Sequence, residues 1–160
     1  MTRVFDTLRI GEASDPGWSL ELRLVRERES GTHHLVYGGE AHGPFATEDD
    51  ALAECTRSFG SPAWRSSLTL AEGEAPCPVC GAPLARSARY PRALCPPCVL
   101  EAIDREGRRV RFANESISGG FVAHPVGGEP SQDHDCWVRG SACRADESYF
   151  GGIVVQRVDG

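Results

Sequence analysis

The first part of the chain alternates between apolar and polar positions in the manner of a half-buried β-strand. Trp18, Leu20, Leu22 and Leu24 occupy every second position, with Ser, Glu and Arg between them. Side chains two residues apart share one face of a strand, so this pattern predicts a strand over residues 18–24. A polar stretch and a second apolar run at residues 34–37 then predict a hairpin.

A helix is predicted after this hairpin. Thr47 precedes three consecutive acidic residues, an arrangement typical of an N-cap followed by carboxylates in the first turn. Leu52, Cys55 and Phe59 recur at helical spacing and predict one buried face. Gly60 is expected to end the helix.

Short apolar runs predict strands through most of the remaining chain. These strands are expected at residues 66–70, 109–113, 121–124, 136–139 and 153–158, and a short helix at 98–104. The predicted fold class is therefore α+β, β-rich with one or two short helices and a four-cysteine structural zinc module.

Three regions are expected along the chain. They are an N-terminal α+β unit over residues 1–70, a cysteine module over 76–104 and a C-terminal β-rich segment over 105–160. The connector over residues 71–76 is too short to allow free movement, so we expect the regions to unfold as one cooperative unit.

Four of the seven cysteines form two pairs of the CxxC type. Cys77 and Cys80 make the first pair, and Cys95 and Cys98 make the second after a spacer of fourteen residues. Two intervening residues allow both thiolates of a pair to meet one tetrahedral ion, and Gly81 permits the tight turn that follows. Four thiolates leave no open coordination position, so the pattern predicts one structural zinc ion per chain.

The cysteine region resembles the four-cysteine treble-clef and zinc-ribbon modules over residues 76–104. The treble clef is the better fit, since it implies a first pair in a hairpin and a second pair in the first turn of a helix. Residues 112–121 and 150–156 are similar to small bacterial proteins with a comparable cysteine region. This second resemblance implies fold unity and no particular activity.

The composition indicates the cellular compartment of the protein and excludes one kind of catalysis. The chain has no signal-like start and no apolar run near the roughly 20 residues of a membrane span, so we expect a cytoplasmic protein with reduced thiols and no membrane contact. All seventeen basic residues are arginine, which excludes catalysis by lysine. The bias towards Ala, Arg and Gly is typical of GC-rich bacterial genomes.

Other residues offer alternative chemistry. Cys95 and Cys98 at the start of a helix could be a thioredoxin-like redox pair, although the upstream pair favours metal. Cys136 and Cys143 could form a second metal site or lie in the core. His134 lies between two aspartates and could act as a general base, but a solvated loop is commoner.

Arginines gather around the cysteine module, although the whole chain carries a net charge of −6. Residues 84–111 contain seven arginines and three acidic residues, which gives this segment a net charge of +4. This segment predicts a possible nucleic-acid face. The candidates are Arg86, Arg89, Arg92, Arg108, Arg109 and Arg111.

No nucleophile–base pair, phosphate loop or open metal site emerges, so the sequence favours a binding protein over an enzyme. The leading hypothesis is a zinc-stabilised protein that binds another protein as an adaptor, inhibitor or immunity-type partner. The alternatives are a nucleic-acid-binding zinc protein and a thiol redox enzyme. The sequence does not indicate an oligomeric state.

Overall fold

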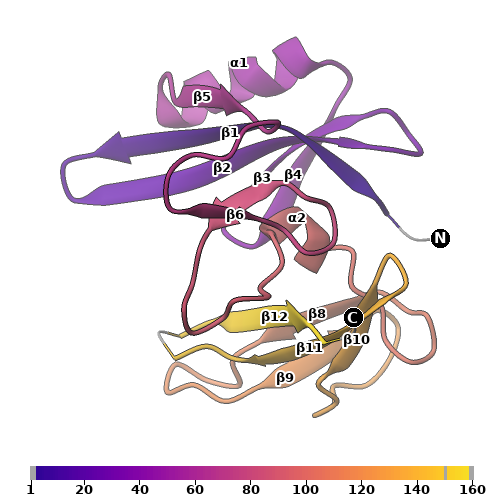
Figure 1. Ribbon diagram of the computed structural model, residues 1–160. Helices are drawn as coiled ribbons and strands as arrows, with labels where there is room; N and C mark the ends of the chain where they lie inside the picture. Colours follow the sequence, from indigo (N-terminus) through magenta and orange to yellow (C-terminus); the bar gives the residue numbers. More distant parts are fainter. Residues whose placement is uncertain (1–2, 150, 159–160) are drawn as a thin grey trace.

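The computed structural model describes residues 3–149 and 151–158, and its fold is β-rich with two short helices. Phe150, the first residue of the 150–156 segment that is similar to small bacterial proteins, lies outside the described residues. Figure 1 shows helix α1 over one side of a sheet, the cysteine hairpin and α2 beneath the other side, and the C-terminal strands below them. The cysteine module thus lies between the N-terminal sheet and the C-terminal strands.

Five antiparallel strands make the N-terminal sheet, in the order β4-β3-β2-β1-β5. Their bounds are Phe5–Asp15 (β1), Trp18–Glu27 (β2), His33–Tyr37 (β3), Glu40–Phe45 (β4) and Ala63–Ser66 (β5). Leu24 pairs with Leu35 across β2 and β3, so the predicted hairpin over residues 18–37 is confirmed. A register shift between Thr7 and Arg9 interrupts the pairing of β1 with β2.

Helix α1 (Glu48–Phe59) covers one face of this sheet. Asp50 N donates to the Thr47 hydroxyl at 3.1 Å, so the predicted N-cap is confirmed. Ala51 and Cys55 are fully buried against Leu22 and neighbouring apolar side chains of the sheet. Burial of apolar area, at about 25 cal/mol per Å², holds the helix in place.

The opposite face of the sheet contacts the cysteine module. The module contains the hairpin of β6 (Glu74–Pro76) and β7 (Pro83–Ala85), followed by the short helix α2 (Pro96–Val99). Arg23 of β2 is only 1% exposed, and its guanidinium donates to the Pro83 carbonyl at 2.7 Å and to Glu21 at 2.8 Å. A buried cation therefore joins the sheet to the cysteine hairpin.

Two small sheets complete the C-terminal half. One contains β8 (Val110–Ala113) and β9 (Val122–Pro125), and the other contains β10 (Asp135–Val138), β11 (Ser141–Glu147) and β12 (Ile153–Arg157) in that order. Their buried side chains share one core with three of the cysteines of the two CxxC pairs. The members of this core include Cys77, Cys95, Cys98, Val110, Val138 and Val155.

A buried ion pair connects the N-terminal sheet to the C-terminal half. Glu101 follows α2 and is fully buried; its carboxylate accepts from Phe5 N at 2.9 Å and from two guanidinium nitrogens of Arg139 at 2.9 Å each. Arg139 also donates to the Phe5 carbonyl at 2.9 Å. Arg139 has a φ of +48°, unusual for a non-glycine residue, in the two-residue turn that it forms with Gly140 between β10 and β11.

Some predicted elements differ from the structure. The strand predicted at residues 66–70 is wrong, because β5 ends at Ser66 and Leu68 is 93% exposed. The helix predicted at 98–104 is also displaced, since α2 spans Pro96–Val99. Strands β1 and β4 were not predicted. No helix of the described residues is long and apolar enough to cross a membrane.

We predict that the Arg139→Met variant will lose about 3 kcal/mol or more of unfolding free energy. Removing the partner of a buried charge leaves that charge without compensation. The double variant Glu101→Leu/Arg139→Met should lose less than the sum of the two single variants, as measured by urea denaturation.

Arg28→Met is the matched control, because Arg28 makes a comparable two-nitrogen contact with Asp6 on the exposed surface. Exposed ion pairs contribute little, so this variant should change stability only slightly. Equal losses for Arg139→Met and Arg28→Met would contradict the role of the buried pair.

Candidate metal centre

The first cysteine pair lies in the turn between β6 and β7. Cys77 N donates to the Ala82 carbonyl at 2.8 Å, and Gly81 N donates to the Cys77 carbonyl at 2.8 Å. Gly81 has a φ of +81°, in the left-handed region that glycine adopts without a steric cost. The turn brings Ala82 N to 3.4 Å from the Cys80 sulfur, so a backbone amide points at this thiol.

The second pair lies at the start of α2. Cys95 is the N-cap, and the prolines at the first two helical positions remove amides that would have no intrahelical partner. Val99 N donates to the Cys95 carbonyl at 3.1 Å and closes the turn that carries Cys98. Cys95 N lies 3.4 Å from the Cys77 sulfur, so the second pair also donates a backbone amide to the first.

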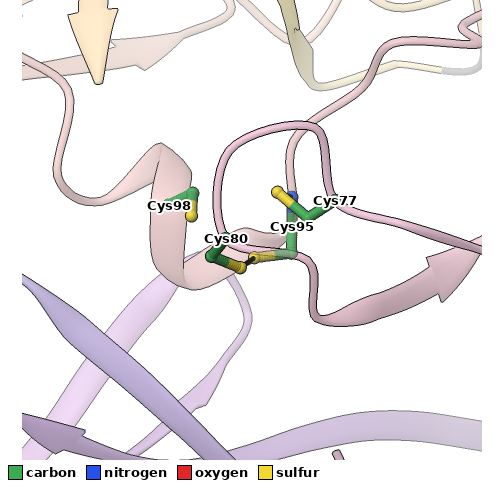
Figure 2. A group of neighbouring side chains, drawn as sticks. All are labelled: Cys77, Cys80, Cys95 and Cys98. Atoms are coloured by element: carbon green, nitrogen blue, oxygen red, sulfur yellow. Dashed lines mark hydrogen bonds between the residues drawn. The ribbon is translucent and has the colours of Figure 1, made fainter. Parts of the chain in front are cut away.

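The structure brings the four sulfurs together, as the sequence predicts. All of them lie within 4.8 Å of one another, and the Cys80 and Cys95 sulfurs are 3.5 Å apart (Figure 2). Zinc–sulfur bonds of about 2.3 Å in a tetrahedron place sulfurs about 3.8 Å apart, whereas a disulfide requires about 2.05 Å. All seven cysteines are free thiols. The donor set and spacing therefore fit a metal ion such as zinc.

The electrostatics of the cluster favour a cation. Hydrogen bonding from the Cys80 thiol lowers the pKa of Cys77. The neighbouring sulfurs of Cys77 and Cys80 raise the pKa of Cys95, and burial raises it further. The pKa of Cys98 is also raised by the Cys77 sulfur and its other sulfur neighbours. Four adjacent thiolates cannot all form unless a cation offsets their charge.

Burial separates this cluster from solvent. Cys95 and Cys98 are fully buried, Cys77 is 3% exposed and Cys80 is partly buried. Arg139 provides positive charge nearby; its pKa is raised first by its hydrogen bond to Glu101 and further by the cysteine sulfurs. An ion held by four thiolates would carry a net charge of −2, which this arginine would partly balance.

The other cysteine pair does not form a second cluster. Cys136 and Cys143 are direct partners across β10 and β11 and are buried in the C-terminal core. Burial raises the pKa of Cys136 to about 12, so its thiol stays protonated at neutral pH. Within the described part of the chain, the four-cysteine group is the one cluster of metal-binding side chains.

The proposed redox pair and general base are poorly placed for those roles. Cys95 and Cys98 are buried, whereas a redox thiol needs access to its partner. His134 Nδ1 lies 2.6 Å from the Ala145 carbonyl, and its ring stacks on Phe121 with 4.0 Å between ring centres. The flanking Asp133 contacts Arg105 at 2.8 Å, and the carboxylate near the imidazole is that of Asp146, 3.1 Å from Nδ1.

The six arginines of the predicted nucleic-acid face come from two segments, and several are already engaged. Arg86, Arg89 and Arg92 lie between β7 and α2, whereas Arg108, Arg109 and Arg111 precede or begin β8.

Carboxylates and an aromatic ring occupy three of these arginines. Arg108 contacts Asp104 at 2.9 Å and Glu106 at 3.3 Å. Arg111 lies 3.9 Å from Glu40, and Arg89 stacks over the Tyr149 ring at 4.1 Å. These contacts reduce the positive charge available to a polyanion.

The sequence did not reveal the charged residues that surround the cluster. Glu101 is the one charged residue in the apolar run from Val99 to Ile103. A charged side chain in such a run is rarely buried without a partner, so this position was the signal in the sequence for a paired carboxylate. Arg139 precedes Gly140, as in a tight hairpin turn. Their contact spans 38 residues, so local patterns could not indicate it.

We predict that Cys77→Ser and Cys95→Ser will each abolish binding of one zinc ion per chain, because a hydroxyl replaces a thiolate ligand. Zinc content measured by elemental analysis should fall from about one equivalent to near zero. Cys55→Ala is the control: this cysteine is equally buried but lies in α1, and the variant should retain zinc. Full zinc content in either serine variant would contradict the assignment.

We also predict that a strong chelator will lower the thermal midpoint for the whole chain. Three of the four cysteines share the C-terminal core, and the hairpin that carries the first pair is joined to the N-terminal sheet by the contact of Arg23 with the Pro83 carbonyl. Loss of an ion worth on the order of 10 kcal/mol should therefore affect both sides. Fluorescence of single-tryptophan variants that retain Trp64 or Trp137 would follow each side separately. A midpoint that shifts for Trp137 and not for Trp64 would show that the module is independent of the sheet.

Comparisons with known protein families, with curated proteins and with solved structures find no match for this chain. The candidate metal centre therefore rests on its sulfur geometry, its burial and the chemistry of its four donors.

Proposed function

We propose that this chain is a zinc-stabilised binding protein without enzymatic chemistry, whose ligand is another protein of the adaptor, inhibitor or immunity type. The observation that carries the proposal is the closed set of four sulfur donors, three of which are almost completely buried. A tetrahedral ion held this way has no position left for a substrate or water. Its role would be to fix the surfaces that surround it.

The cysteine module resembles a treble clef, and this resemblance supports zinc as the ion. One cysteine pair lies in the turn of the β6–β7 hairpin, and the other lies at the start of α2. Two backbone amides point at the sulfurs of Cys77 and Cys80, and amides of this kind stabilise thiolate charge. Zinc prefers four thiolates in this geometry and undergoes no redox change.

Exposed apolar side chains support a protein partner. Leu68 and Leu70 are 93% and 47% exposed on the segment between β5 and β6. Ile117 and Tyr149 are also largely exposed in the C-terminal half. Large apolar and aromatic side chains of this kind are common at protein interfaces.

Nucleic acid is the competing ligand. The guanidinium of Arg109, which has no partner among the described residues, favours it. The net charge of −6 and the carboxylate partners of Arg108 weigh against it. A polyphosphate needs a continuous run of positive charge, and its binding weakens steeply as salt rises.

We predict that the zinc-loaded chain will form a saturable one-to-one complex with one purified protein. Crosslinking in the source organism would identify the candidate, and calorimetry with both purified proteins would measure the affinity. Binding should weaken at least tenfold in the zinc-free Cys95→Ser variant, because the surfaces on both sides of the centre lose their fixed arrangement.

The same preparation would be titrated with single- and double-stranded DNA and RNA at 50 mM and 200 mM salt. Tight nucleic-acid binding that falls steeply with salt and disappears in Arg108→Glu/Arg111→Glu would overturn the protein-partner proposal. The absence of any complex between purified proteins would overturn it as well.

A further inference from the structure

A cavity lined by three arginines lies between the N-terminal sheet and the C-terminal half. Its volume is about 320 Å³, within the range of small ligand sites. Segments far apart in the sequence meet at its walls: the approach to β1, the start of β4, the end of α2 and the start of β8. The lining residues are Arg3, Glu40, Ala41, Leu100, Arg109, Val110, Arg111 and Val126.

Two of the three arginines are held in place by their neighbours. The Arg3 guanidinium lies 4.6 Å from the centre of the Phe5 ring and 3.6 Å from Glu27. Arg111 donates to the Gly39 carbonyl at 3.3 Å, and its 3.9 Å contact with the exposed Glu40 carboxylate is long for an ion pair. Side chains that are already ordered lose less entropy when a ligand binds.

The third arginine has unused donors. Within residues 3–149 and 151–158, the Arg109 guanidinium has no hydrogen bond or ion pair, although it is partly buried at the cavity wall. Arg109 and Arg111 are two residues apart on extended backbone, so their side chains leave the same side about 6.6 Å apart. Two guanidinium groups at this spacing can converge on one planar oxyanion.

The other lining residues indicate the chemistry of the ligand beyond its anionic group. Leu100, Ala41 and Val126 supply aliphatic surface, and Val126 is 54% exposed. Glu40 is the one acidic side chain of the lining, and its side chain is 63% exposed. Three arginines and one glutamate give a lining charge of +2, which suits a single anion and disfavours a polyphosphate.

We propose that this arginine cavity binds the C-terminal carboxylate of a protein partner whose last residue is aliphatic. The carboxylate would contact Arg109 and Arg111, and the aliphatic side chain would contact Leu100 and Val126. The last residue of a protein chain carries a carboxylate and a side chain together, and a residue of this kind matches a cavity of this size. This inference rests on the proposed protein-binding function and names the part of the partner that binds.

The test uses the peptide acetyl-Gly-Ser-Leu with a free carboxylate and the zinc-loaded protein labelled with ¹⁵N. Resonances of the Arg109 and Arg111 side chains should shift in a saturable way. The amidated peptide should bind at least tenfold more weakly, because it lacks the charge that the guanidinium groups recognise. The Arg109→Gln/Arg111→Gln variant should lose at least tenfold in affinity and keep its zinc.

Arg86→Gln/Arg89→Gln is the matched control, since it removes the same charge from the other arginine segment and should bind the peptide normally. Equal binding of the free and amidated peptides would overturn the proposal. Inorganic phosphate that binds as tightly as the peptide would show a site for simple anions only. If an acetyl-Ser-Glu-Gly amide binds as tightly as the peptide, the site recognises side-chain carboxylates. If DNA binds more tightly than the peptide and this binding is lost in Arg109→Gln/Arg111→Gln, the site recognises nucleic acid.

The partner complex separates this inference from the proposed function. If the purified partner binds Arg109→Gln/Arg111→Gln as tightly as the unmodified chain, the cavity is not the contact and the protein-binding function stands. If the peptide binds the cavity and no partner complex forms, the carboxylate site stands and the proposed function fails.

Discussion

Four thiols confined within 4.8 Å impose the constraint on which the arrangement of this chain depends. Their sulfurs cannot all ionise without a cation, and three of them have almost no contact with water. A divalent ion would convert this repulsion into four bonds, so the free energy of metal binding becomes free energy of folding. The β6–β7 hairpin and α2 are short elements with little core of their own, and a bound ion would stabilise their positions.

The position of the cluster gives this constraint wide structural consequences. Arg23 connects the sheet to the hairpin through the Pro83 carbonyl, and Glu101 with Arg139 connects the sheet to the turn between β10 and β11. Arg23 is buried and pairs with Glu21, whereas Arg139 pairs with Glu101 and also feels the charge of the cysteine sulfurs. The arginine cavity lies at the same boundary between the two halves. Loss of the ion would therefore disturb the candidate binding surface without any contact between ion and ligand.

The features that the sequence predicted are local ones. The CxxC spacing, the Thr47 cap and the alternation at Leu20, Leu22 and Leu24 each operate within a few residues. Strand β1 was missed because its register shift near Thr7 interrupts the two-residue period. Leu68 and Leu70 have the two-residue apolar spacing of a strand, but β5 ends before them, at Ser66. The contact of Glu101 with Phe5 spans 96 residues, and no local pattern encodes it.

X-ray absorption at the zinc edge would test the metal centre most directly, using the full-length protein purified without added metal. We predict one zinc ion per chain with four sulfur neighbours at about 2.3 Å and no nitrogen or oxygen ligand. A shell containing nitrogen or oxygen at about 2.0–2.1 Å would mean that the centre is open or built from other residues. That result, or metal-free protein with the cysteines paired as disulfides, would contradict the closed four-thiolate site.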